Sequence, residues 1–415
     1  MNLLNLISNQ HDYFDIIKKE WLESSDSFPD FLHEFRAETK KQNQLFIQNS
    51  SQTLGKQLKR FHKLPFQKKH WKSKTYSLIK DLLWNENVFS IHQHMSNSEI
   101  QEFQKEIEYF LTEVRSFAPE LNFNDIGQAA RNYIVFAMFK KIHNDSSGYS
   151  EAAFGYSMLY PFTDNYIDSK THSSSDKASY NRLIFEQIKG LKPKAQTSHQ
   201  QKTCALIEAI ETQYPRNDHP EIYDLLLMML DAQSCSLSQQ QKDTPLSKED
   251  RLNISIYKGG ISVLIDRYFV HKELSEKDIL FYLGFGLVLQ LADDLQDINE
   301  DDTKGHSTLM TIDTDAVSEE RIVNKLLHYL HHIMEAYAPE NMDFMNFVLS
   351  SSYLLILTSV IGSKEFFSES YLRKINRYLP VESSFLEQLL NNRIENSVSK
   401  VQKKYMKQLD DLLNK

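Results

Sequence analysis

The sequence predicts an all-α protein. Glycine and proline, which interrupt helices, are scarce, with 11 and 10 residues among 415. Leucine, lysine, glutamine and glutamate, which favour helices, are plentiful, whereas the alternation of valine and threonine that is typical of strands is rare. The length suits one large domain or two ordinary ones, and the hydrophobic fraction of 41% is ordinary for a globular protein.

Residues 1–118 are predicted to form an N-terminal helical region. Its role is unknown, because these residues contain no catalytic pattern. Ser98 and Glu99 precede apolar residues that recur with helical spacing, which predicts a capped amphipathic helix. Two short polar stretches, residues 49–51 and 169–175, are predicted to be loops. The apolar residues of the predicted amphipathic helix are Ile100, Phe103, Ile107 and Phe110.

Residues 36–80 form a basic segment in a chain whose net charge is −9. The segment carries 12 Lys and Arg residues against the single acid Glu38, a net charge of +11, with aromatic residues between them. Two interpretations are open: a solvated helical face, or contact with an anionic membrane surface. A nucleic acid partner is not expected.

The sequence shows no sign of export. Its two cysteines, Cys204 and Cys235, cannot form a disulfide framework, and the N-terminus lacks the basic start of a signal peptide. Residues 281–292, taken as the longest apolar stretch, contain Gln290 and are too short to span a bilayer. We therefore expect a cytoplasmic protein, with membrane association left open.

Residues 119–415 are predicted to form the main domain, because their apolar segments are each long enough for a buried or half-buried helix. Together these segments predict a large helical bundle, in which sites form from side chains on facing helices. The predicted helices are residues 126–142, 152–168, 222–240, 252–270, 277–301, 319–337 and 344–361.

A cluster of aspartates ends the strongly apolar helix predicted at residues 277–301. Asp293, Asp297 and Asp301 recur at every fourth position, so they lie on one face of a helix. Like charges at this spacing repel one another, and burying them costs free energy unless a cation compensates. Carboxylate oxygens with room for water and phosphate suit Mg²⁺.

A second acidic cluster ends the predicted helix 152–168, where Asp164 and Asp168 are again four residues apart. Two facing helices with a carboxylate pair each are able to hold Mg²⁺ ions that bind a diphosphate. Such ions neutralise the diphosphate as it leaves. The alternative is that both clusters are solvated acidic helix ends.

The later cluster resembles a motif of the trans-isoprenyl diphosphate synthases. Their second aspartate-rich motif reads FQxxDDxxD, and here Leu289 replaces the phenylalanine. The resemblance implies a class I terpenoid synthase-type helical bundle, with an extra N-terminal helical region that lies outside it. The residues that match the motif are Gln290, Asp293, Asp294 and Asp297.

Other segments resemble the same family. Asp164-Asn165-x-x-Asp168 is similar to a degenerate form of the family's first motif, DDxxD. Lys258, which two glycines follow, resembles the lysine of the family's Lys-Thr-Gly segment, which binds the allylic diphosphate. The resemblance covers residues 120–310.

The departures from the family concern its second diphosphate. In the segment that resembles the family's GKRxRP motif, Gln128 and Ala129 stand in the places of the lysine and the first arginine, and Arg131 is retained. No arginine pair follows Asp168. The resemblance therefore implies a site that ionises one allylic diphosphate and lacks the pocket for isopentenyl diphosphate, as in terpene synthases.

The resemblance and the neighbouring cations give a set of candidate site residues. Asp164, Asp168, Asp293 and Asp297 are the expected Mg²⁺ ligands and catalytic residues, with Asn165, Asp294 and Asp301 as further metal ligands. The expected diphosphate-binding residues are Arg131, Arg251, Lys258, Gln290 and Lys304, of which Arg251 and Lys304 are alternatively plain surface residues.

We therefore expect a Mg²⁺-dependent enzyme that ionises a prenyl diphosphate and cyclises or quenches the cation, with release of diphosphate. The alternative is a prenyltransferase, which either elongates the chain or transfers the prenyl group to another acceptor. A further alternative is a non-catalytic subunit that binds prenyl diphosphates. A homodimer is compatible with the sequence.

Overall fold

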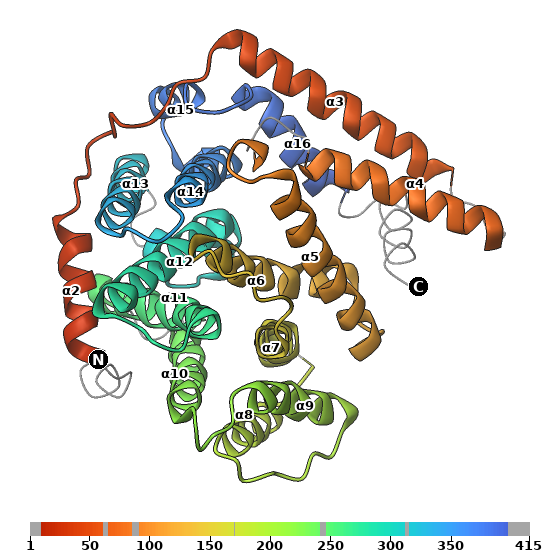
Figure 1. The fold of residues 1–415 in the computed structure, drawn as a ribbon. Helices are drawn as coiled ribbons and strands as arrows, with labels where there is room; N and C mark the ends of the chain where they lie inside the picture. Colours follow the sequence, from red (N-terminus) through yellow and green to blue (C-terminus); the bar gives the residue numbers. More distant parts are fainter. Residues whose placement is uncertain are drawn as a thin grey trace. The chain divides into compact units, whose positions relative to one another are not determined.

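The computed structural model describes residues 10–60, 65–84, 91–169, 171–240, 246–311 and 315–396. These residues form 15 α-helices and four short 3₁₀-helices, without a strand (Figure 1). The predicted all-α class is therefore confirmed.

The chain forms two compact units, each of which combines segments that are far apart in the sequence. Both units contain residues from the predicted N-terminal region and from the predicted main domain. The first unit comprises residues 1–28, 124–314 and 321–342, and the second comprises residues 29–123, 315–320 and 343–415.

The first unit is a bundle built around two long antiparallel helices, α11 and α12. Helix α10 packs against α11, α7 packs against α9, and the N-terminal helix α2 lies against both α11 and α12 (Figure 1). Its helices are α2 (Gln10–Glu23), α6 (Phe123–Ile142), α7 (Glu151–Asp168), α8 (Ser174–Ile188), α9 (Ser198–Gln213), α10 (Pro220–Ser236), α11 (Lys248–Val270), α12 (Glu276–Lys304) and, from residue 321, α13 (Ala316–Ala336).

The second unit contains the remaining helices, of which α3 and α4 pack side by side. Trp71 of α4 is buried and donates a hydrogen bond from its indole Nε1 to the backbone oxygen of Gln57 on α3, at 2.7 Å. The helices of this unit are α3 (Ala37–Lys59), α4 (Pro65–Trp84), α5 (Asn97–Phe117), α14 (Met342–Gly362), α15 (Glu369–Asn376) and α16 (Ser383–Asn396).

All seven helices predicted after residue 119 are present, and two local predictions need correction. The amphipathic helix α5 is confirmed, but its N-cap is Ser96 rather than Ser98, in a capping box with Glu99. Residues 49–51, predicted as a loop, lie inside α3. Their polar side chains are exposed or half-exposed there. The free-energy cost of placing these weak helix formers in a helix is therefore small compared with the stabilisation from packing of the opposite helix face.

Helix α14 also corrects the sequence analysis. Among the described residues it is the one helix long and apolar enough to cross a membrane, which the expectation based on residues 281–292 missed. In this structure 61% of its most apolar window is buried, and a buried core helix has the same length and composition. The helix therefore does not decide where the protein resides.

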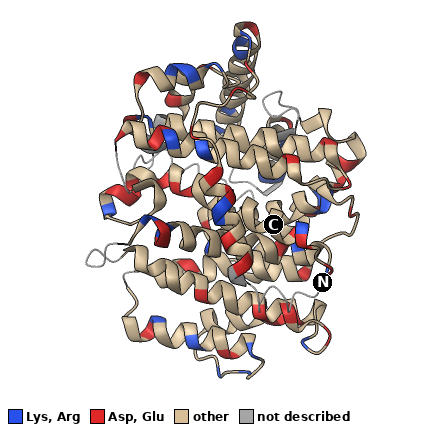
Figure 2. Ribbon diagram, turned by 90° about the vertical axis from the view of Figure 1, so that its left-hand side faces the viewer, with Lys and Arg blue, Asp and Glu red and all other residues tan. Residues whose placement is uncertain are grey.

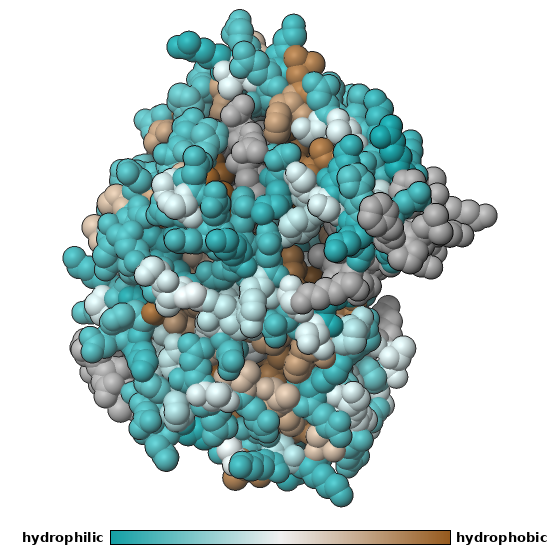
Figure 3. Space-filling view, turned by 45° about the vertical axis from the view of Figure 1, so that its right-hand side comes forward, coloured by the Kyte–Doolittle hydropathy of each residue, from teal (hydrophilic) through white to brown (hydrophobic). Residues whose placement is uncertain are grey.

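The basic segment is partly neutralised within the second unit. Lys40 is buried and bonds the backbone oxygen of Asn376, and Lys80 pairs with Glu108 at 2.8 Å. Charged residues of both signs are interspersed along the helices (Figure 2). The surface in Figure 3 is mainly hydrophilic, with small apolar patches. Exposed cations of α3 and α4 are Lys41, Lys56, Lys59, Arg60, Lys69 and Lys74.

Helices α11 and α12 touch backbone to backbone at two glycines. A methyl group added to Gly286 would lie 2.2 Å from the carbonyl oxygen of Gly259, and one added to Gly259 would lie 2.3 Å from the carbonyl oxygen of Gly286. Real Cβ atoms do not approach this closely, so only glycine fits at both positions. Gly259, the glycine after Lys258, thus serves the close packing of two helices.

We expect Gly286→Ala to lower the free energy of unfolding by about 1–3 kcal/mol, because a backbone oxygen cannot turn aside from the new methyl group. The matched control is Gly127→Ala in α6, where nothing lies within 4 Å of the added methyl group. That change should be neutral or stabilise by up to about 1 kcal/mol. Urea unfolding followed by far-UV circular dichroism measures both, and equal effects would contradict the close contact.

Candidate active site

A cavity of about 280 Å³ lies inside the first unit, between α6, α7, α11 and α12. Residues from both acidic clusters reach it, although the clusters are more than a hundred residues apart in the sequence. The cations predicted on α6 and α11 reach the same cavity. The predicted site residues that line it are Arg131, Asp164, Lys258, Gln290 and Asp293.

Helix α7 brings Asp164 to the cavity. The helix begins at the N-cap Ser150, whose side chain accepts a hydrogen bond from the backbone of Ala153. Asp164, near the other end of the helix, is half-buried, and its Oδ1 accepts a hydrogen bond at 2.9 Å from the side chain of Gln233 on α10. This hydrogen bond from the Gln233 amide group fixes the orientation of the Asp164 carboxylate. A carboxylate accepts several hydrogen bonds or metal contacts, so Asp164 is able to bind a further partner.

The other two residues of the earlier cluster are not brought to the cavity. Asn165 is exposed and donates a hydrogen bond to Asp125 at the start of α6, at 3.1 Å. It follows Asp164 by one position, so on a helix it points to a different face. Asp168 is the last residue of α7, and its side chain lies outside the described residues.

Helix α12 places its first two aspartates differently. Asp293 is exposed toward the cavity, whereas Asp294 is 7% exposed and accepts a hydrogen bond from Gln290 at 2.8 Å. Burial, reinforced by the charge of Asp293, raises the pKa of Asp294 to about 7, although the Gln290 bond and the charge of Lys258 act in the opposite direction. Asp294 is therefore a buried support behind the cavity wall.

The next two aspartates continue the acidic face of α12 beyond the cavity. Partial burial and the charges of Asp293 and Asp301 raise the pKa of Asp297 to about 6. Burial also raises the pKa of Asp301, which His306 partly opposes through a hydrogen bond at 2.9 Å. Burial is the largest cause of both shifts, and the neighbouring acids add a negative potential that a bound cation would relieve.

The acids do not form a ready-made metal cage. In the part of the chain that the structure describes, no three His, Cys, Asp or Glu side chains lie close enough together to hold a metal ion. Two carboxylates from different helices, Asp164 on α7 and Asp293 on α12, nevertheless line one cavity. Mg²⁺ is usually held by one or two carboxylates together with substrate phosphates and water, so these residues fit such an ion.

Two of the predicted diphosphate ligands are engaged elsewhere. Arg251 donates hydrogen bonds to the backbone oxygens of Leu246 and Thr308, and so ties the start of α11 to the segment after α12. Lys304 is exposed and pairs with Glu300 one turn earlier on α12. Neither residue lines the cavity.

The inner end of the cavity is polar, which the sequence analysis missed. Asp266 lines it from α11, is 1% exposed, and has no hydrogen-bond partner within ordinary geometry for either carboxylate oxygen. Burial raises the pKa of Asp266 well above its usual range, an effect that the Asn132 side chain partly offsets. The available signal was an acid placed eight residues after Lys258, on the same face of an apolar helix.

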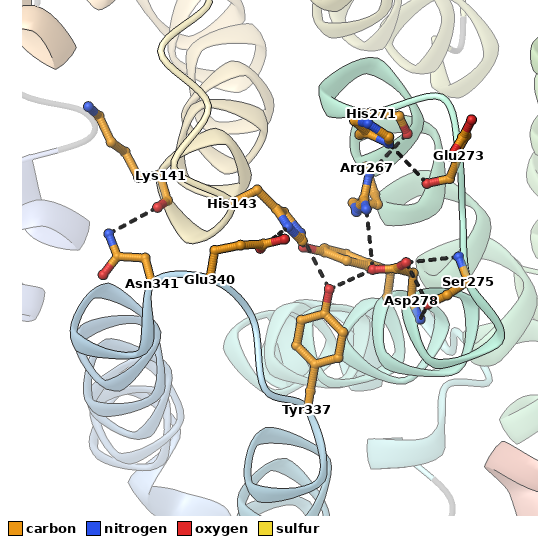
Figure 4. A network of polar contacts seen from close by, with 11 residues as sticks. Lys141, His143, Arg267, His271, Glu273, Ser275, Asp278, Tyr337, Glu340 and Asn341 are labelled. Atoms are coloured by element: carbon orange, nitrogen blue, oxygen red, sulfur yellow. Dashed lines mark hydrogen bonds and ion pairs between the residues drawn. The ribbon is translucent and has the colours of Figure 1, made fainter.

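A larger cavity of about 1040 Å³ lies near the opposite ends of α11 and α12. Some of its polar groups form a network: Arg267 bonds Asp278 at 3.2 Å, and Asp278 accepts a hydrogen bond from Tyr337 at 2.6 Å (Figure 4). His143 contacts Glu340 at 2.7 Å in the same network. Because these bonds join α11 and α12 to the segments that carry His143, Tyr337 and Glu340, the network ties helices together, and we assign it a structural role.

Comparison with known proteins gives no matching family model, no matching curated protein and no matching solved structure. The resemblance of the motifs to the trans-isoprenyl diphosphate synthases therefore stays a prediction.

Proposed function

We propose that this protein is a Mg²⁺-dependent enzyme of the class I terpenoid synthase type, which ionises a prenyl diphosphate and releases diphosphate. One observation carries the proposal: Asp164, Asp293 and Lys258, which lie on three helices far apart in the sequence, line one cavity of about 280 Å³. A lysine that lines the same cavity as two carboxylates is the combination expected for a metal-bound diphosphate.

Each side chain has a role in this proposal. Lys258 and Arg131 bind the diphosphate oxygens and offset their charge, and the amide of Gln290 keeps Asp294 in place behind them. Asp164 and Asp293 supply hard oxygen ligands from facing helices. Bound Mg²⁺ would stabilise the negative charge that grows on the diphosphate as the C–O bond breaks.

The cavity has few cations, which favours one diphosphate over two. Lys258 and Arg131 are the cations that line it. Gln128 also lines it, in the place of the family's lysine, and Ala129 is fully buried. A prenyltransferase that elongates chains binds a second diphosphate and therefore needs more positive charge. Transfer to an acceptor without a diphosphate is the runner-up.

The opposing proposal is a non-catalytic subunit that binds a prenyl diphosphate. Asn165 supports it, because this residue stands where the family has an aspartate and turns toward Asp125 rather than into the cavity. The retained pair of Asp164 and Asp293 favours the enzyme, because carboxylates in one cavity repel each other unless a cation joins them.

We expect the purified protein to release diphosphate from an allylic diphosphate in the presence of Mg²⁺ and without isopentenyl diphosphate. Asp293→Asn should slow this release by about 100-fold or more, because it removes charge from the metal-binding face. The panel consists of the dimethylallyl, geranyl, farnesyl and geranylgeranyl compounds. Released diphosphate and extracted products are measured together.

The matched control is Asp302→Asn, which removes an exposed acid near the end of the same helix. It should leave the rate unchanged. Release only when isopentenyl diphosphate is present would establish chain elongation instead. Tight binding of the diphosphates by the wild type without any release would establish the non-catalytic subunit.

The exposed lysines of α3 and α4 support a second, compatible proposal: contact with an anionic membrane surface. Each lysine near such a surface contributes about 1 kcal/mol, so Lys56→Glu, Lys59→Glu and Lys69→Glu together should weaken vesicle binding by at least about 100-fold. Sedimentation with phosphatidylserine vesicles measures it. Charge reversal of three exposed lysines elsewhere is the control, and equal losses in both triple variants would contradict a specific surface. The control lysines are Lys189, Lys192 and Lys194.

A further inference from the structure

The inner end of the cavity has the wrong chemistry for a prenyl tail. Asp266 lies on the same face of α11 as Lys258, and eight residues at a rise of about 1.5 Å separate them by about 12 Å along the helix. An apolar tail that filled this end would press against a carboxyl group with no partner. A buried polar group left unpaired costs about 1–3 kcal/mol.

The neighbours of Asp266 are polar and are held in place by one another. Ser262, one turn earlier on α11, shares a hydrogen bond with the hydroxyl of Tyr160 on α7. Asn132 on α6 donates to the hydroxyl of Ser157 at 3.1 Å. Asn132, Tyr160, Ser262 and Asp266 all line the cavity, so three helices contribute polar groups to its inner end.

This arrangement suits a small molecule that donates and accepts hydrogen bonds. A buried water molecule needs two to four polar partners in a space of its own size, and Asp266, Asn132 and Ser262 supply them. In the described part of the chain, neither carboxylate oxygen of Asp266 has a hydrogen-bond partner within ordinary geometry.

We propose that Asp266, with Asn132 and Ser262, positions a water molecule that captures the prenyl cation, so that the product is an alcohol rather than a hydrocarbon. This inference rests on the proposed function. It adds to it the second substrate, water, and the residues that position this water.

The C–O bond of the substrate breaks, and its electron pair leaves with the diphosphate. The cation that remains faces the inner end of the cavity, which the water rather than the prenyl tail occupies. There a lone pair of the water forms the new C–O bond, while Asp266, Asn132 and Ser262 hold the water by hydrogen bonds. The proton that the oxygen then loses passes to the released diphosphate.

The test is product analysis after turnover of geranyl and farnesyl diphosphate with Mg²⁺ in ¹⁸O-water. The wild type should give alcohols that carry ¹⁸O, together with unlabelled diphosphate. Asp266→Leu keeps much of the side-chain volume and removes both oxygens. We expect it to lower the ratio of alcohol to hydrocarbon by at least about 10-fold while diphosphate release stays measurable, because an apolar wall favours loss of a proton over capture by water.

Asp266→Asn and Ser262→Ala are the companion variants, each checked for folding by circular dichroism. Both should lower the alcohol share less than Asp266→Leu does, and they keep the test decisive if that variant does not fold. Diphosphate release by the wild type with hydrocarbons as the products, or an alcohol share unchanged in all three variants, would overturn the role of Asp266 and leave the proposed function standing. No diphosphate release from any substrate, or ¹⁸O found in phosphate rather than in the alcohol, would overturn both.

Discussion

Replacing Asp278 with alanine is expected to lower the free energy of unfolding by about 3–5 kcal/mol, because it leaves the charge of Arg267 buried and unpaired. The Arg267 side chain is 5% exposed. The carboxylate of Asp278 also accepts hydrogen bonds from Tyr337 and from the backbone and side chain of Ser275, which caps α12. Although burial acts to raise the pKa of Asp278, these bonds and the charge of Arg267 lower it overall. Urea unfolding near pH 7 measures the change.

Two companion variants separate the buried charge from the rest of the network. Tyr337→Phe removes one hydrogen bond to a charged group and should cost about 1.5–3 kcal/mol. Replacing Arg267 and Asp278 together, by methionine and leucine, should cost less than Asp278→Ala, because no unpaired charge remains. A double variant that is no more stable than Asp278→Ala would contradict the argument from the unpaired charge.

The helices that build the cavity were predictable because their physics is local. Helices α6, α7, α11 and α12 each have a long apolar run with helical spacing, and each was predicted within a few residues. Residues four apart on a helix share a face, so the reach of Asp164 and Asp293 into one space followed once the bundle was assumed. The all-α class follows from the same local signals.

The partners of individual side chains were not predictable, because they depend on distant segments. Arg251 bonds the backbone oxygen of Thr308, a residue beyond the whole of α12, and Asn165 bonds Asp125 on the preceding helix. The spacing of Asp266 from Lys258 places both on one face of α11, but it does not show which side chains of other helices surround Asp266. The division into two units was not predictable for the same reason, because each unit combines segments from distant parts of the chain.

The two cavities of the first unit differ in a way that bears on function. In the larger one Arg267 pairs with Asp278, so a ligand of this pair would have to displace existing bonds. The smaller one is lined by Lys258 and Asp293, and among the described residues both carboxylate oxygens of Asp266 lack a hydrogen-bond partner. Groups that the fold does not need for its own stability are available for binding, which is why we place the chemistry in the smaller cavity.

Removal of the Asp294 charge is expected to change how stability depends on pH. The folded pKa of about 7 lies above the ordinary value of 3.8, so between these pH values the folded chain holds a proton that the unfolded chain has lost. Stability from this group is therefore complete below about pH 4 and is lost as the pH rises through about 7. The full effect is on the order of 4 kcal/mol.

Asp294→Asn should therefore leave stability near pH 4 almost unchanged and raise it near pH 8 by about 2–4 kcal/mol, because the amide cannot ionise. The control is Asp302→Asn, which replaces an exposed acid on the same helix. It should change the free energy of unfolding little at either pH. Taking the difference between variant and wild type cancels the contributions of Asp297 and Asp301, whose pKa values are also raised. If the proposed metal site is real, Mg²⁺ should stabilise the wild type more at pH 8 than at pH 5, because it competes with protons for the same carboxylates. A variant that is no more stable than the wild type at pH 8 would show that Asp294 carries no burial penalty.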